Sequence, residues 1–126
     1  MDREIFSNLM CKGNIHHFTK DEINDFVKTS ILKCDDGGKI KLIITTEELA
    51  ELIQAVTKFI RGFDNRTDVA FTDVHTGITE EIADVLICIE YLKEICVISD
   101  TEINKAIDIK LDRLNKKERI FDYGIT

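Results

Sequence analysis

Two pairs of carboxylates are notable for their spacing and for their neighbours. Glu48 and Glu51 lie three residues apart, as do Glu81 and Asp84, and each pair encloses an alanine and borders aliphatic residues. On a helix, side chains three residues apart share one face, at about 6 Å or less. A solvated acidic face requires neither the alanine nor the aliphatic neighbours. The repeated arrangement therefore indicates a site.

If the helices that carry these pairs pack side by side, four carboxylates converge. Two like charges about 5 Å apart repel by roughly 3 kcal/mol at an effective dielectric constant near 20, so such groups take up protons or bind cations. Ligands that are all oxygen favour Mg²⁺, or Mn²⁺, over zinc. A di-iron site is the nearest alternative, but it needs Glu-x-x-His pairs, and no histidine of this chain occupies such a position.

Helix-start signals and apolar periodicity predict the elements that carry these acids. Capping boxes begin at Thr19, Thr45 and Ser99, and Thr79 is a further candidate N-cap. Apolar residues at three- and four-residue steps follow each signal, and Gly62 is a natural helix end. We therefore predict an all-α, four-helix-bundle-like fold. Its helices span about 20–34, 46–62, 78–97 and 100–118.

The segments between these helices are predicted to be irregular. Residues 64–77 are polar without periodicity and are expected to form a loop, while residues 39–44 alternate briefly and favour a short extended segment. On these boundaries both acidic pairs fall in the first turn of a helix. There, carboxylates complement the helix dipole, which is a simpler explanation for acids such as Glu47 and Glu80.

Length and charge exclude several classes of function. The 126 residues predict a single domain over 1–126. A net charge of −7 disfavours binding to a nucleic-acid polymer. The apolar stretches are too short to cross a membrane, and the first residues lack the layout of a signal peptide. We therefore expect a cytoplasmic protein.

The four cysteines include no Cys-x-x-Cys pair and favour buried, reduced thiols. A zinc site is the alternative, although its spacing matches no common ligand pattern. Its ligands would be Cys11, His16, His17 and Cys34.

The two acidic pairs and their flanking residues resemble the signature of the MazG-like all-α nucleoside triphosphate pyrophosphohydrolases. Residues 47–58 read Glu-Glu-Leu-Ala-Glu-Leu-Ile-Gln-Ala-Val-Thr-Lys, and residues 80–87 read Glu-Glu-Ile-Ala-Asp-Val-Leu-Ile. The resemblance covers about residues 45–117. It leaves 1–44 as a helical extension and 120–126 as a tail, and the segment between the pairs is longer than is usual in the family.

The resemblance implies an Mg²⁺-dependent enzyme, with Mn²⁺ as a possible substitute. Such an enzyme cleaves a nucleoside or deoxynucleoside triphosphate between the α and β phosphates and serves nucleotide-pool house-cleaning. The resemblance assigns metal binding to Glu48, Glu51, Glu81 and Asp84. A carboxylate that binds no metal, Glu47 or Glu80, would orient the attacking water. Lys58, Lys110 and Arg113 are candidates for binding the substrate phosphates, although each is equally consistent with a solvated surface.

Family members commonly form dimers or tetramers, so the resemblance also implies a homodimer or homotetramer. Apolar residues that spread around the helices are consistent with a subunit interface, as at Ile87, Ile89, Ile95 and Ile98. Two other functions stay open. One is a non-catalytic helical interaction or regulatory module whose acids only cap helices. The other is an enzyme similar to phosphoribosyl-ATP pyrophosphohydrolase.

Overall fold

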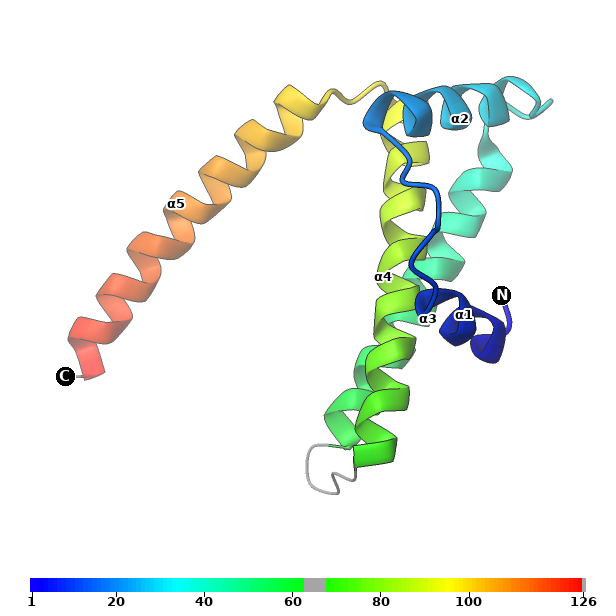
Figure 1. The fold of residues 1–126 in the computed structure, drawn as a ribbon. Coiled ribbons are helices and arrows are strands. Elements are labelled where there is room, and N and C mark those ends of the chain that lie inside the picture. The colour runs from blue at the N-terminus through cyan, green and yellow to red at the C-terminus, as the bar shows by residue number, and fades with distance from the viewer. Residues whose placement is uncertain (63–67, 126) are drawn as a thin grey trace. The chain divides into compact units, whose positions relative to one another are not determined.

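In a computed structural model the regular secondary structure of the described residues consists of helices joined by short connections, with no strand (Figure 1). The structure describes the backbone of residues 1–62 and 68–125 and the side chains of residues 1–62 and 73–117. The predicted all-α class is confirmed. The helices are α1 (Arg3–Met10), α2 (Lys20–Leu32), α3 (Lys39–Arg61), α4 (Asp68–Cys96) and α5 (Asp100–Ile125).

The chain forms two compact units, Met1–Ile95 and Cys96–Thr126. In the first unit, α3 and α4 run antiparallel and make the main packing contact (Figure 1). The beginning of α3 lies against the end of α4, since a Cβ placed on Gly38 would be only 2.8 Å from Ile95 Cδ1. Further along, the Lys41 ammonium lies 4.9 Å from the centre of the Tyr91 ring. This register positions the carboxylates described below.

Two of the predicted capping boxes form. At the start of α2, Thr19 Oγ1 accepts a hydrogen bond from the Glu22 amide, and Glu22 Oε1 accepts one from the Thr19 amide, each at 3.1 Å. Ser99 and Glu102 make the same reciprocal pair at the start of α5. These starts were predictable because every partner lies within four residues of the others. The helix α5 then continues past the predicted end near residue 118, to Ile125.

The predicted start of α3 near residue 46 is wrong, as is the extended segment over 39–44. Asp36 caps the helix earlier, because its carboxylate accepts hydrogen bonds from the amides of Gly38 (3.0 Å) and Ile40 (2.9 Å). Thr45 and Thr46 are therefore interior, and their hydroxyls donate to backbone carbonyls of the preceding turn. A lone extended segment had no partner strand to stabilise it.

The predicted start of α4 near residue 78 is also wrong. Thr79 does not cap the helix, because its hydroxyl donates to the carbonyl of His75 at 2.9 Å, one turn earlier. The predicted loop is helical over residues 68–77, while residues 64–67 lie outside the described part of the chain. Once a helix has nucleated, each further residue adds at little cost. Here the added turns pack beside α3, and Val97, at a left-handed φ of 56°, ends α4.

The described side chains form a small apolar core. The buried apolar residues are Val27, Val85, Cys88 and Tyr91. Many large apolar side chains are exposed instead, among them Phe26 and Ile53. Cys88 is buried as expected, and burial raises the pKa of its thiol. Cys11 and Cys96 are exposed, against the expectation of buried thiols.

Among the described residues, no helix combines the length and the apolar character needed to cross a bilayer.

Candidate metal centre

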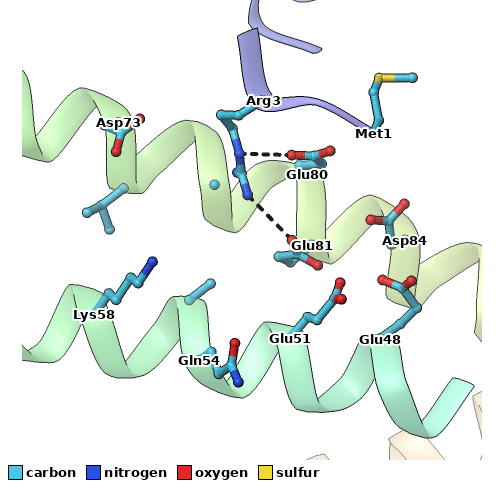
Figure 2. A pocket seen from close by; sticks show the side chains of 13 residues that line it. Met1, Arg3, Glu48, Glu51, Gln54, Lys58, Asp73, Glu80, Glu81 and Asp84 are labelled. Atoms are coloured by element: carbon cyan, nitrogen blue, oxygen red, sulfur yellow. Dashed lines mark ion pairs between the residues drawn. The ribbon is translucent and has the colours of Figure 1, made fainter. Parts of the chain in front are cut away.

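A polar pocket of about 500 Å³ lies between facing surfaces of α3 and α4, with α1 at its edge (Figure 2). The residues of α3 that line it recur at helical spacing, and so do the residues of α4. From α3 come Glu48, Glu51, Gln54, Ala55 and Lys58; from α4 come Asp73, Val74, Gly77, Glu80, Glu81 and Asp84; Met1 and Arg3 complete it. The two acidic pairs of the sequence therefore line one pocket.

Three carboxylates of this pocket converge closely enough to share one cation. One oxygen each from Glu48, Glu51 and Glu81 lies within 4.8 Å of the other two. Asp84 lines the same pocket, and its side chain is drawn near that of Glu48 in Figure 2. Antiparallel packing of α3 and α4 produces this meeting, because it sets residues 48 and 51 opposite residues 84 and 81.

Burial and the neighbouring charges raise the pKa of two carboxyl groups in the pocket. Burial is the largest cause of the rise in the Glu48 pKa to about 7, and the charges of Glu51 and Asp84 and a hydrogen bond with Glu51 add to it. The pKa of Glu81 is raised by burial first, and then by the charges of Glu51 and Asp84. Without a cation, these raised pKa values favour the protonated form of the two groups over the charged form.

Two oxygens of the converging carboxylates are buried without a hydrogen-bond partner among the described residues. Glu81 is 8% exposed, and its Oε2 has no hydrogen-bond partner among the described residues. Glu48 Oε2 is buried and likewise without one in that part of the chain. A buried carboxylate oxygen without a partner is costly, unless a proton or a cation satisfies it. An all-oxygen donor set of this kind fits Mg²⁺ or Mn²⁺.

The position of the acids within their helices removes the simpler explanation for them. The predicted boundaries placed both pairs in a first turn, where the helix dipole favours carboxylates. With α3 beginning at Lys39 and α4 at Asp68, all four acids lie in helix interiors. The dipole effect falls off within the first turn. It therefore does not account for Glu48, Glu51, Glu81 or Asp84.

The two carboxylates predicted to orient water occupy different environments. Glu47 is exposed and is not among the residues that line the pocket. Glu80 lines the pocket, is 6% exposed and lies against α1, where Arg3 Nε is 3.0 Å from Glu80 Oε2. Only Glu80 of the two is placed near the converging carboxylates.

Arg3 is a pocket residue that sequence reasoning missed. Its Nη2 lies 3.5 Å from Glu81 Oε1, in addition to the contact with Glu80. The helix α1 was not predicted, although Asp2 supplies its cap by accepting hydrogen bonds from the amides of Glu4 and Ile5. That local signal could have indicated a helix. Nothing near Arg3 in the sequence indicates that it reaches α4.

The three predicted phosphate contacts divide between the two units. Lys58 lines the pocket, on the same face of α3 as Glu48 and Glu51. Lys110 and Arg113 lie on α5, in the second unit, where both are exposed. A phosphate-binding role for these two residues stays a prediction.

The alternative zinc site does not form within the described residues, where the only converging group of potential ligands is Glu48, Glu51 and Glu81. His16 instead pairs with Glu22 at 3.0 Å, and the Cys34 thiol donates to the carbonyl of Ser30.

Comparisons with models of protein families, with characterised proteins and with solved structures give no significant match.

Proposed function

We propose that this protein is an Mg²⁺-dependent nucleoside triphosphate pyrophosphohydrolase with a MazG-type site. The convergence of Glu48, Glu51 and Glu81 in one pocket carries the proposal. Support also comes from the buried oxygens of Glu48 and Glu81 that have no hydrogen-bond partner among the described residues, and from the sequence resemblance over residues 45–117. The charged substrate is compatible with an acidic protein because a divalent cation lies between the two.

The reaction proposed is hydrolysis between the α and β phosphates. A water oxygen bonds to the α-phosphorus, the bond from that phosphorus to the oxygen bridging to the β-phosphate breaks, and pyrophosphate leaves with the bridging oxygen. The water loses a proton to a base or to solvent. When bound, Mg²⁺ offsets phosphate charge and lowers the pKa of bound water. Glu48, Glu51, Glu81 and Asp84 would hold it, and Mn²⁺ could replace it.

The remaining pocket residues suit a polyphosphate chain. Lys58 lies along α3 from the carboxylates, so the pocket is acidic at one end and contains a basic residue at the other (Figure 2). Its volume of about 500 Å³ is within the range of about 300–1,000 Å³ that is typical of small-molecule sites. Of Glu47 and Glu80, the two candidates for orienting the attacking water, only Glu80 lines the pocket.

Self-association into a homodimer or homotetramer is part of the same proposal. The described residues bury few apolar side chains, while α3 exposes an apolar stripe at helical spacing. An exposed apolar stripe of this kind is typical of a protein interface. The bundle suggested by the resemblance would be completed by packing between subunits. The stripe consists of Leu49, Ile53, Val56 and Ile60.

The test is an assay of the purified protein with Mg²⁺ and a panel of nucleoside and deoxynucleoside triphosphates, including dUTP, deaminated bases and phosphoribosyl-ATP. Pyrophosphate and orthophosphate are measured separately. We expect pyrophosphate release that is lost in Glu81→Gln and kept in Glu94→Gln, which removes an exposed acid of α4 outside the pocket. Orthophosphate release alone, or no release across the panel, would contradict the proposal.

A non-catalytic interaction module is the competing function, and the exposed apolar stripe is the observation that favours it. Its carboxylates would not bind a divalent cation. Such a module would therefore show no divalent-ion dependence of stability and no pyrophosphate release.

A further inference from the structure

We propose that Arg3 binds a phosphate of the substrate and that Glu80 is the positioning residue that holds Arg3 in place. This inference rests on the proposed function and adds to it a residue from outside the region of resemblance. Arg3 comes from α1, far in sequence from the pocket residues of α3 and α4, and its side chain enters the pocket above Glu81 (Figure 2).

The contacts of Arg3 leave one of its nitrogens available. Nε lies 3.0 Å from Glu80 Oε2, and Nη2 lies 3.5 Å from Glu81 Oε1. Nη1 is buried and has no hydrogen-bond partner among the described residues. A guanidinium group has five N–H donors and binds phosphate through parallel N–H donors. Two carboxylates therefore orient the group, while the two N–H donors of Nη1 remain for a ligand.

Glu81 belongs to the cluster of converging carboxylates and also contacts Arg3. Oε1 is the oxygen nearest Arg3, whereas Oε2 is buried without a hydrogen-bond partner in the described part of the chain. A carboxylate shared in this manner ties the guanidinium to the cluster of Glu48, Glu51 and Glu81. A phosphate that contacts a cation in the cluster would therefore have Arg3 within reach.

Gly77 supplies the space that the guanidinium needs. A Cβ at this position would lie 2.8 Å from Arg3 Nη1 and 3.4 Å from Arg3 Cζ. Glycine inside a helix costs about 1 kcal/mol relative to alanine, so it weakens α4 while leaving room for Arg3. The close approach concerns Nη1, the nitrogen that has no hydrogen-bond partner in the part of the chain that the structure describes.

The placement suits the phosphates that leave. In Figure 2 Arg3 lies between the end of the pocket that holds Glu48 and Asp84 and the end that holds Lys58. Asp73 also lines the latter end. Breaking the bond between the α-phosphorus and the bridging oxygen transfers negative charge to the departing pyrophosphate. A guanidinium in this position stabilises that charge.

The experiment measures two affinities separately by calorimetry: Mn²⁺ for the protein, and inorganic pyrophosphate for the Mn²⁺-loaded protein. In Arg3→Gln we expect pyrophosphate to bind about tenfold more weakly, the loss typical of one charge-assisted hydrogen bond. Mn²⁺ should bind as well as in the wild type, or more tightly, because a positive charge beside Glu81 is gone. Arg3→Lys should recover part of the loss, since it keeps the charge and loses the fork of donors.

Gly77→Ala is the second variant, and it guards against a general loss of structure. Alanine favours the helix, so α4 is retained, while the added methyl group displaces Nη1. We expect weaker pyrophosphate binding with Mn²⁺ binding intact. Lys12→Gln is the matched control, because it removes an exposed positive charge that does not line the pocket. It should leave both affinities unchanged.

Glu80→Gln tests the positioning role. It should weaken pyrophosphate binding and leave Mn²⁺ binding intact. Glu80→Asp, which keeps the carboxylate, should retain part of the pyrophosphate affinity that Glu80→Gln loses. A lower turnover number with unchanged pyrophosphate affinity would overturn this assignment and return Glu80 to the orientation of water.

The outcomes separate this inference from the proposed function. Mn²⁺ and pyrophosphate binding that survive unchanged in Arg3→Gln and Gly77→Ala would overturn the role of Arg3 and leave the proposed function standing. If Arg3→Gln loses both ligands while Gly77→Ala loses neither, Arg3 is structural and the inference fails. Absence of Mn²⁺ binding in the wild-type protein would overturn both.

Discussion

Glu48 on α3 and Glu81 on α4 place carboxylate oxygens within 4.8 Å of each other, and each residue has one buried oxygen without a hydrogen-bond partner in the described part of the chain. The two residues lie in helix interiors, where no dipole effect favours a negative charge. Their proximity raises the free energy of the metal-free site, because the negative charges repel in a partly buried pocket. A bound cation would remove that penalty. The first two predictions follow from this relationship.

Divalent cations should raise the melting temperature. A ligand that binds only the folded state stabilises it by about 2.7 kcal/mol at a concentration one hundred times its dissociation constant. We expect Mg²⁺ and Mn²⁺ to increase the Tm by several degrees and Glu81→Gln to abolish the increase. Scanning calorimetry at constant protein concentration, with and without chelator, measures it. Glu94→Gln is the control and should show the same increase as the wild type. Melting curves of the wild type that are equal with and without the cations would argue for the interaction module.

The metal-free protein should lose stability as the pH rises from about 4.5 to about 7. The folded-state pKa of Glu48 is raised to about 7, and that of Glu81 is raised as well. A carboxyl group whose pKa is raised on folding contributes its full stability below its unfolded pKa, and this contribution is lost as the pH approaches the folded value. Thermal unfolding in chelator across this range measures the effect.

Glu48→Gln is the matched variant for the pH experiment. It removes the carboxyl group whose pKa is raised to about 7, so the decline in stability between these pH values should be smaller than in the wild type. An unaltered decline would show that other groups cause it. Stabilisation by Mg²⁺ should also be greater at pH 8 than at pH 5, because protons compete with the cation for the same oxygens.

The apolar stripe on α3 should mediate self-association. Ile53 is 66% exposed, and Leu49, Val56 and Ile60 continue the stripe at helical spacing. Light scattering coupled to size-exclusion chromatography should give a mass of two or four chains for the wild type. Ile53→Glu should shift the protein toward the monomer, because burying a charge in an apolar interface is costly. A wild-type monomer at high concentration would contradict the proposal.

Asp36, and not Thr46, should determine where α3 begins. Asp36→Ala removes the acceptor for the amides of Gly38 and Ile40 and should lower the melting temperature. Thr46→Ala should leave it unchanged or raise it slightly, since Thr46 lies inside the helix and alanine has the higher helix propensity. The reverse order of effects would support the start of the helix that the sequence predicts.

Helix type was predictable from sequence, whereas helix boundaries were only partly so. The caps at Thr19 and Ser99 depend on residues within four positions, and both form as predicted. Thr45 has the same sequence pattern, but its hydroxyl bonds within α3 because Asp36 caps that helix earlier. Two competing start signals cannot be ranked from their residues alone. The balance depends on what the added turns pack against.

The sequence by itself determined that Glu48 and Glu51 share one helix face and that Glu81 and Asp84 share another. This follows from the helical period and holds wherever each helix begins. Only the tertiary structure decided that the two faces meet in one pocket and that Arg3 of α1 enters it beside Glu80. The physical reason is the range of the interactions. Periodicity and capping act over a few residues, whereas the antiparallel register of α3 and α4 and the docking of α1 depend on packing between distant segments.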